Sequence, residues 1–519
     1  MRSNDTVWHR LLQLLAGLAL CAAAQAAVPP RLELTATPAW QGWSRPGRST
    51  EIDIRLSTDT AVRATVEVLA GRQTVRSELE LQPGRVSRLH IPASPAATGA
   101  VTVVLTTSPD AASPAGPPRP PAPSEPSDRR ELAIAQSESP LLGAALAAGG
   151  PVGLEGFHTV ALTAQDLPRN ASAYSSIDAL MLDAPTLAAL DQRQLAALLS
   201  HAAACGRIVL LNADAGVRQA LETAGGCGGL TLMTAASPSE ARQLLTSSLA
   251  AGVSAAITAT SLAGLSRPAQ ATWNRLAVAL AVYFAAALLV PMFVVSRSVA
   301  VRLLVPVTVP ALATVALLAL LHTLQPPSQL RVWSEGESGA QVARYQAWQQ
   351  FPGQARERLR VPIPPQLAAA AQACDPTQPM RFDFDAARGQ LTSAEFETRL
   401  FRQVRLCYSG SFPMARALAT ELRGDGLREV RNTGPTAWPA GLLLAQGKAD
   451  ALPAVAAGAR TAIGASASPP PGDAVVRAAM ARIRPDPEGV AALWPLDLAG
   501  VAGESIDSMG WLLVSAVPR

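Results

Sequence analysis

Two long apolar stretches near the middle of this 519-residue chain constrain its fold more than any other feature. Residues 276–295 contain no charged side chain, and residues 303–321 form a second uncharged run of similar length. At 1.5 Å of rise per residue, a helix of about 20 residues spans about 30 Å, the thickness of the hydrocarbon core of a bilayer. The sequence therefore predicts two transmembrane helices joined as a hairpin. Two helices buried in a protein core are the alternative.

The connection between the two stretches, residues 296–302, sets the expected orientation of the hairpin. It carries Arg297 and Arg302, and arginine in a short loop is typical of the cytoplasmic side of a membrane. Arg267 and Arg275 flank the first stretch at its other end, which weakens this argument. We expect both large flanking regions to lie outside the cytoplasm.

The first residues have the layout of a secretory signal peptide. Basic side chains precede an apolar run at 11–24, and Ala24 and Ala26 are the small residues that a signal peptidase recognises. We predict a signal peptide over residues 1–26, cleaved near Ala26, with an uncleaved anchor helix as the alternative. Cys21 lacks the small preceding residue that a lipoprotein site needs. The expected location is a bacterial inner membrane, with both large regions periplasmic.

Four cysteines remain beyond the signal peptide: Cys205, Cys227, Cys374 and Cys407. They lie two on each side of the apolar stretches, and an even number in an oxidising compartment indicates disulfides. Pairing within each region predicts Cys205–Cys227 and Cys374–Cys407. A zinc site is the alternative, but no Cys-x-x-Cys occurs, and Cys205 with the nearby His201 supplies only half a site. We expect neither a metal nor another cofactor.

Residues 31–107 alternate between polar and apolar side chains, as in the run at 51–56, and turn residues separate the runs. Short strands at this spacing predict an immunoglobulin-like β-sandwich. Trp40 and Trp43 are expected to pack in its core or at its rim, with a ligand platform as the alternative. A linker rich in Pro, Ala and Ser follows at 108–128.

Strand and helix patterns alternate across residues 129–265, which predicts a parallel sheet covered on both faces, a doubly wound α/β domain. Strands are expected at 177–183 and 207–211. Asp191 and Gln194 form the sequence pattern of a capping box at the start of a helix between them.

Asp183 follows a predicted strand, and open α/β sheets bind ligands at the carboxyl ends of their strands. Asp183, His158 and His201 are therefore the candidate ligand residues of this domain, although a cap or turn role is the alternative for Asp183. We find no usable catalytic constellation and expect no catalytic residue.

Three segments of this region form a larger pattern: 174–183 is a strand that ends in aspartate, 190–198 contains a Gln-x-x-Ala-Leu helix, and 205–210 leads into a strand. This pattern resembles the type 1 glutamine amidotransferase-like domain of bacterial membrane proteins. Residues 43–48 resemble the sandwich placed before that domain, so the resemblance covers roughly the first half of the chain. It implies a catalytically degenerate domain, because no G-x-C-x-G elbow occurs and Cys205 replaces the first glycine of a Gly-Gly pair.

Residues 325–519 predict a β-rich α+β domain with one or two helices. The whole chain is therefore expected to be a multidomain membrane protein: a β-sandwich, a doubly wound α/β domain, a two-helix transmembrane hairpin and a β-rich α+β domain. The net charge of +4 is mild for this length and no basic block occurs, which excludes nucleic acid as a partner.

The predicted function is a non-catalytic, membrane-tethered periplasmic scaffold or interaction subunit of a bacterial envelope assembly. Its expected partners are the lipid bilayer and other envelope proteins, and the sequence does not define an oligomeric state. One alternative is a periplasmic hydrolase or transferase that uses Asp183 with His158 or His201. A second alternative is a transmembrane sensor.

Overall fold

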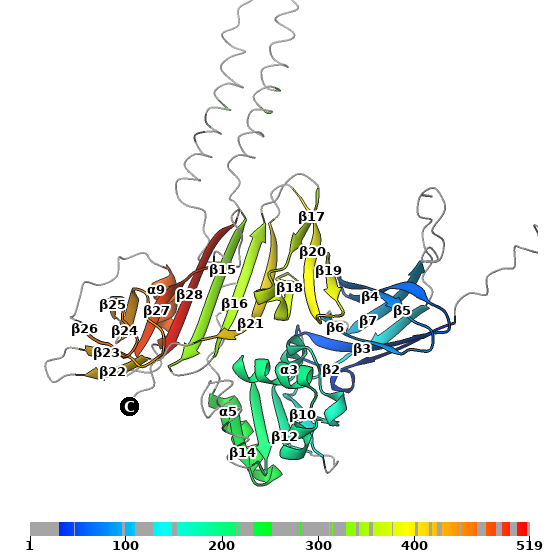
Figure 1. The fold of residues 1–519 in the computed structure, drawn as a ribbon, viewed down its shortest axis with the longest axis horizontal. Helices are drawn as coiled ribbons and strands as arrows, with labels where there is room; N and C mark the ends of the chain where they lie inside the picture. Colours follow the sequence, from blue (N-terminus) through cyan, green and yellow to red (C-terminus); the bar gives the residue numbers. More distant parts are fainter. Residues whose placement is uncertain are drawn as a thin grey trace, which may run out of the picture.

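The computed structural model describes residues 31–108, 128–213, 232–251 and 328–515, most with short gaps, and isolated positions at 216, 219, 278, 281, 284, 311 and 314. The predicted signal peptide (1–26), both members of the predicted Cys205–Cys227 pair, and nearly all of 276–295 and 303–321 lie outside the described residues. Strands dominate what is described (Figure 1).

The fold class predicted from the sequence is wrong. The described chain is mostly β-strand, with short helices. Within the residues that the structure describes, no helix combines the length and the apolarity needed to cross a bilayer. The prediction of a transmembrane hairpin at 276–295 and 303–321, and with it the inner-membrane location, is therefore not supported. The prediction rests on hydropathy and run length, which by themselves do not establish a membrane span.

The first part of the chain forms two facing sheets. One is antiparallel, with the order β1-β3-β6. The other contains β5, β4, β7 and β8 in that order. Alternate residues of β3, Ile52, Ile54 and Leu56, are buried against Val66 and Val68 of β4, as the period of two predicts. The strands are β1 (Leu32–Pro38), β3 (Thr50–Thr58), β4 (Val62–Ala70), β5 (Gln73–Leu81), β6 (Ser87–Ala93), β7 (Ala100–Ser108) and β8 (Asp128–Ala133). We call these two sheets the N-terminal sandwich.

The second sheet of the N-terminal sandwich does not end at β5. β19 (Met380–Asp385) pairs in parallel with β5, placing Phe382 opposite Val75. β20 (Gln390–Thr398) and β17 (Glu357–Pro362) extend the sheet further, giving the order β17-β20-β19-β5-β4-β7-β8. One apolar core contains buried residues from both parts of the chain. Segments on either side of the apolar stretches therefore build one sheet (Figure 1).

The segment between β8 and β15 (Gln329–Glu337) in the sequence forms a five-stranded, all-parallel sheet with the order β11-β10-β12-β13-β14. Leu180 and Leu210 share one core with Leu198 of α3, whereas Met181 shares the core on the other face with Leu245 of α5. The elements are β10 (Leu141–Ala145), β11 (His158–Leu162), β12 (Ala179–Asp183), α2 (Ala184–Ala188), α3 (Gln192–Ala203), β13 (Arg207–Leu211), β14 (Leu232–Ala235) and α5 (Pro238–Ala251). We call residues 141–251 the parallel-sheet unit.

Trp40 joins the N-terminal sandwich to the parallel-sheet unit. It is fully buried in the core of that unit, and its indole N–H donates to the carbonyl oxygen of Ala173 at 2.9 Å. Trp40 and Gln41 have φ values of 55° and 51°, which non-glycine residues rarely adopt. A Cβ atom on Gly143 would lie 2.8 Å from the Trp40 ring, so glycine is required there. The short strands β2 (Trp43–Ser44) and β9 (Ala135–Gln136) pair nearby.

An eight-stranded sheet, here the C-terminal sheet, has the order β18-β21-β16-β15-β28-β27-β24-β25. α9 (Ala474–Ile483) shares an apolar cluster with several of its strands, and a second cluster joins the sheet to β22, β23 and β26. Cys374 and Cys407 form a disulfide with Cα atoms 5.0 Å apart, the pairing expected from the sequence. The strands are β15 (Gln329–Glu337), β16 (Val342–Phe351), β18 (Ala371–Ala373), β21 (Val404–Pro413), β22 (Leu418–Leu422), β23 (Arg428–Asn432), β24 (Gly441–Ala445), β25 (Lys448–Leu452), β26 (Arg460–Ile463), β27 (Val490–Leu496) and β28 (Asp507–Ser515).

Candidate functional site

A cavity of about 580 Å³ lies where the N-terminal sandwich, the parallel-sheet unit and the C-terminal sheet meet. The loop at 47–49 contributes one wall, Asp178 and His201 a second, and Arg344 with Tyr345 of β16 a third. In Figure 1, α3 lies close to the junction of the two β parts, and it contacts β16 and β21. We call this space the central cavity.

Asp178 holds the loops around the central cavity in place. It immediately precedes β12, and its carboxylate accepts a hydrogen bond of 2.8 Å from the main-chain N–H of Leu141. The same carboxylate forms ion pairs with Arg45 at 3.1 Å and Arg48 at 3.3 Å. The Asp178 side chain is only 10% exposed, whereas those of Arg45 and Arg48 are 23% and 41% exposed, so the pair with Arg45 is the better shielded from water. Asp178 therefore fixes the entry of the chain into the parallel-sheet unit.

Arg207 and His201 approach the cavity from the next strand and from α3. Arg207 starts β13, and its Nε donates to Ser248 Oγ at 2.8 Å. Burial lowers the pKa of Arg207, as does the positive charge of Arg48. Burial also lowers the pKa of His201 to about 4, again with a contribution from Arg48, and His201 Nε2 is buried without a hydrogen-bond partner in the described structure. His201 is therefore neutral at pH 7, while Arg207 keeps its positive charge.

Two tyrosines complete the walls of the central cavity. Burial raises the pKa of both Tyr174 and Tyr345. Their hydroxyl groups donate to the carbonyl oxygens of Pro168 at 3.2 Å and Gln366 at 3.0 Å. With the proton held in this way and the phenolate disfavoured, neither hydroxyl is suited to general acid–base chemistry near neutral pH.

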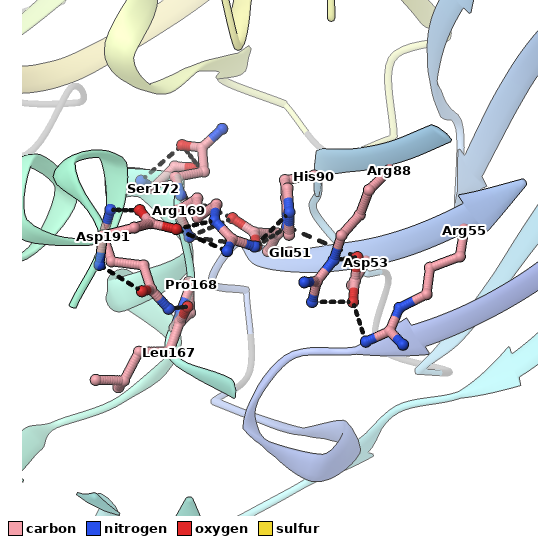
Figure 2. Close-up of polar contacts among 12 residues, drawn as sticks. Glu51, Asp53, Arg55, Arg88, His90, Leu167, Pro168, Arg169, Ser172 and Asp191 are labelled. Carbon is pink, nitrogen blue, oxygen red and sulfur yellow. Dashed lines mark hydrogen bonds and ion pairs between the residues drawn. The ribbon is translucent and has the colours of Figure 1, made fainter. Parts of the chain in front are cut away.

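A buried polar network joins the N-terminal sandwich to the parallel-sheet unit beside the cavity (Figure 2). The carboxylate of Glu51 on β3 accepts hydrogen bonds from the main-chain N–H groups of Arg169, at 3.1 Å, and Asn170, at 2.7 Å. The ring of His90 lies between Glu51 Oε1, 2.9 Å from Nδ1, and Arg169 Nη1, 2.7 Å from Nε2. Because guanidinium only donates, Nε2 must accept and the ring proton is on Nδ1. Arg169 also pairs with Asp191, the N-cap of α3.

Asp53 extends this network along β3. Arg88 forms two hydrogen bonds to its carboxylate, at 2.8 and 2.7 Å, and Arg55 lies 3.5 Å away. Although burial opposes ionisation, the hydrogen bond from Arg88 and the nearby positive charges lower the pKa of Asp53. This part of the network lies entirely within the sandwich, where Asp53 is 3.9 Å from Nδ1 of His90.

The structure places Asp183, His158 and His201 in separate surroundings. Asp183 is the N-cap of α2, and its carboxylate accepts from the N–H groups of Thr186, at 2.9 Å, and Ala147, at 3.0 Å. Burial opposes ionisation, but these hydrogen bonds lower its pKa. The ring of His158 packs on Trp43 with centroids 3.8 Å apart. His201 packs on Tyr174, with centroids 5.2 Å apart.

The three residues are not brought together. His158 starts β11 and lies opposite Leu141, the first residue of β10, whereas Asp183 ends β12 and lies opposite Leu211, the last residue of β13. His158 and Asp183 therefore lie at opposite ends of the parallel strands, about 13 Å apart along the strand direction. Of the three residues, only His201 lines the central cavity. The cavity thus lies at the end of the sheet where the parallel strands begin, not at their carboxyl ends.

Sequence reasoning missed three charged residues that line the cavity, Arg48, Asp178 and Arg207, and also Arg45, which pairs with Asp178. The available signal is weak, because it consists of one charged residue directly before a buried parallel strand, Asp178, and one at the first position of the next, Arg207. Within the described part of the chain, no group of three or more His, Cys, Asp or Glu side chains is placed to hold a metal ion. The groups at this site can donate and accept hydrogen bonds and can attract anions.

No protein-family model and no curated protein matches this chain. The CARDB domain of a Pyrococcus furiosus protein, solved in complex with di-metal ions, is 10% identical over 20% of this chain and 89% of that one, with a TM-score of 0.15. The yeast delta-COP-I mu-homology domain is 9% identical over 37% of this chain and 97% of that one, with a TM-score of 0.16. Similarity this low carries no argument about this chain, and the resemblance to an amidotransferase-like domain gains no support from it.

Proposed function

We propose that this chain is a non-catalytic scaffold or interaction protein. The placement of Asp183, His158 and His201 is the observation that carries the proposal. Asp183 caps a helix, His158 packs on Trp43, and His201 has a buried ring nitrogen. A nucleophile or general base must lie within hydrogen-bond reach of its partner, and Asp183 lies at the opposite end of the parallel strands from His158.

The way in which the units are joined supports the same proposal. Pairing of β5 with β19 joins two distant parts of the chain in one sheet, and Glu51 and Asp178 join the sandwich to the parallel-sheet unit. Units tied by a shared sheet and by buried polar contacts keep a fixed geometry, which a scaffold needs. The exposed edge strands β8 and β17 carry several charged side chains, which disfavour self-association through their free edges.

Site-specific photo-crosslinking in the native host tests this proposal. A photoreactive amino acid replaces one of three exposed residues of the full chain: Glu131 on β8, Arg360 on β17 or Glu155 in the parallel-sheet unit. A protein with a dedicated interaction surface should give the same crosslinked partner in repeated experiments from one of these positions, and not from all three. Mass spectrometry of the crosslinked band identifies the partner.

The Asp183→Asn variant is the matched control. If the chain acts as a scaffold, this change leaves the crosslinked band unchanged, because Asp183 has a local capping role. Capture of no partner from any position, or the same mixture of proteins from all three, contradicts the proposal. A crosslink that the Asp183→Asn change abolishes in a folded protein favours the hydrolase or transferase alternative.

A further inference from the structure

We propose that the central cavity binds a small organic anion, a compound that carries a carboxylate or phosphate group. The proposal depends on the charges that line the cavity, on its size and on its position between three units. It is independent of the scaffold role, because a scaffold need not bind a small molecule.

The cavity has more positive than negative charge. Asp178 is the only carboxylate among the described residues that line it, and Arg45 and Arg48 already share this carboxylate. Arg344 is neutralised separately by Glu335. The charge of Arg207 is the one that no carboxylate pairs with among the described residues. Its hydrogen bonds there go to Ser248, at 2.8 Å to Oγ and at 3.4 Å to the carbonyl oxygen.

Arg207 is also close to the other charges of the cavity. Its guanidinium interacts electrostatically with Asp178, which favours its charge, and with Arg48, which opposes it. Two guanidinium groups that repel each other in a partly buried space are stabilised by an anion placed between them, and arginine binds carboxylate and phosphate in a fixed, bidentate geometry. The same excess charge disfavours a metal cation. An anion is thus the ligand that would balance this site.

The size of the cavity indicates an organic ligand rather than a single inorganic ion. Its volume of about 580 Å³ lies within the range of small-molecule sites. The remaining lining is mixed: Tyr345 and Phe382 supply apolar surface, while Gln346, Ser409 and Ser411 supply hydrogen-bonding groups. An anionic group near Arg207 would leave room for an uncharged part of the molecule toward the C-terminal sheet.

Isothermal titration calorimetry and thermal denaturation of the full chain test the proposal with citrate, glucose 6-phosphate, inorganic phosphate and neutral glucose as probes. We expect citrate or glucose 6-phosphate to bind and raise the melting temperature, because a ligand of the folded state stabilises it. Inorganic phosphate should bind at least tenfold more weakly, and glucose should have no effect. Arg207→Gln should weaken binding of the organic anion at least tenfold, whereas Arg207→Lys should retain part of it.

Arg242→Gln is the matched control, because Arg242 is exposed and pairs with Glu155. Its binding should equal that of the unmodified chain. Circular dichroism shows whether each variant is folded. If Arg207→Gln does not fold, Arg207→Lys takes its place in the comparison with Arg242→Gln. The proposal is overturned if neither organic anion binds, if inorganic phosphate binds as tightly as both, or if Arg207→Gln and Arg242→Gln bind alike.

Discussion

The carboxylate of Glu51 accepts a hydrogen bond of 2.7 Å from the main-chain N–H of Asn170, which connects the N-terminal sandwich to the parallel-sheet unit. Asn170 is the N-cap of the 3₁₀ helix η4 (Ala171–Ser176), which contributes Ser172, Tyr174 and Ser175 to the wall of the central cavity. A residue of one unit therefore fixes the start of an element in the next. The geometry of the cavity depends on this contact.

Glu51→Gln should lower the free energy of unfolding by about 3 kcal/mol, because a buried, charged acceptor is replaced by a group with only one acceptor oxygen. The new amide nitrogen would face N–H donors or the Nδ1–H of His90. Urea denaturation followed by tryptophan fluorescence measures the change. Glu33→Gln, at an exposed position of β1, is the control and should change stability by less than about 0.5 kcal/mol. Equal midpoints for the two variants would show that the Glu51 contacts do not stabilise the fold.

His201 should make stability depend on pH between about 4 and 6.5. Burial lowers the pKa of His201 from its ordinary value of 6.5 to about 4 in the folded chain, so in this range the unfolded chain binds more protons. Unfolding is therefore favoured as the pH falls, by at most about 3 kcal/mol from this group. His201→Phe removes the titration and should flatten the dependence between pH 6.5 and 4. Denaturant midpoints at a series of pH values check this, and parallel curves for both proteins would refute it.

Gly206→Ala should destabilise the chain by about 1–3 kcal/mol, because a Cβ atom there would lie 2.2 Å from Cε1 and Nε2 of the His201 ring. Gly153→Ala is the matched control, since a Cβ atom at Gly153 meets no atom within 4 Å. The double variant Gly206→Ala/His201→Ala should lose less than the sum of the two single changes, because the clash disappears. Additive losses in thermal denaturation would mean that the ring is not the obstacle.

Loss of the Cys374–Cys407 disulfide should lower the free energy of unfolding by about 3–4 kcal/mol, since it closes a loop with a sequence separation of 33 residues. The bond joins the segment after β18 to the middle of β21, where Cys407 lies opposite Trp348. Cys374→Ser/Cys407→Ser should have a melting temperature close to that of the unmodified chain in dithiothreitol. A melting temperature that dithiothreitol leaves unchanged would argue against this stabilisation.

The sequence predicts well the features that depend on neighbouring residues. The expected strands at 177–183 and 207–211 correspond to β12 and β13, and the Asp191–Gln194 capping box is present at the start of α3. Trp40 packs in a core, as expected, although the core is that of the next unit. Local hydrogen bonds and periodicity determine these features, so a short window of sequence contains the necessary information.

The sequence does not predict which distant segments meet. Alternation in β5 indicates which of its faces is buried, but it does not identify β19 as the neighbouring strand. The central cavity has the same difficulty, because Arg48, Arg207 and Arg344 come from three separate segments. Asp183 is a candidate only by the rule that ligands bind at the carboxyl ends of parallel strands. In this chain the cavity lies at the opposite end of the parallel strands, because the sandwich and the C-terminal sheet pack there.

Hydrogen exchange can distinguish the specific pairing of β5 with β19 from general packing of the apolar core. Phe382 on β19 is 1% exposed and lies opposite Val75 of β5, whereas Phe396 is 3% exposed on β20, which does not adjoin β5. Truncating either ring to alanine should cost about 3–5 kcal/mol. Only Phe382→Ala should also speed hydrogen exchange at the amides of β5, because only this change loosens the strand that β5 pairs with. Exchange measured by mass spectrometry distinguishes the two variants. Equal increases in exchange at β5 for the two variants would mean that β5 and β19 are not neighbouring strands.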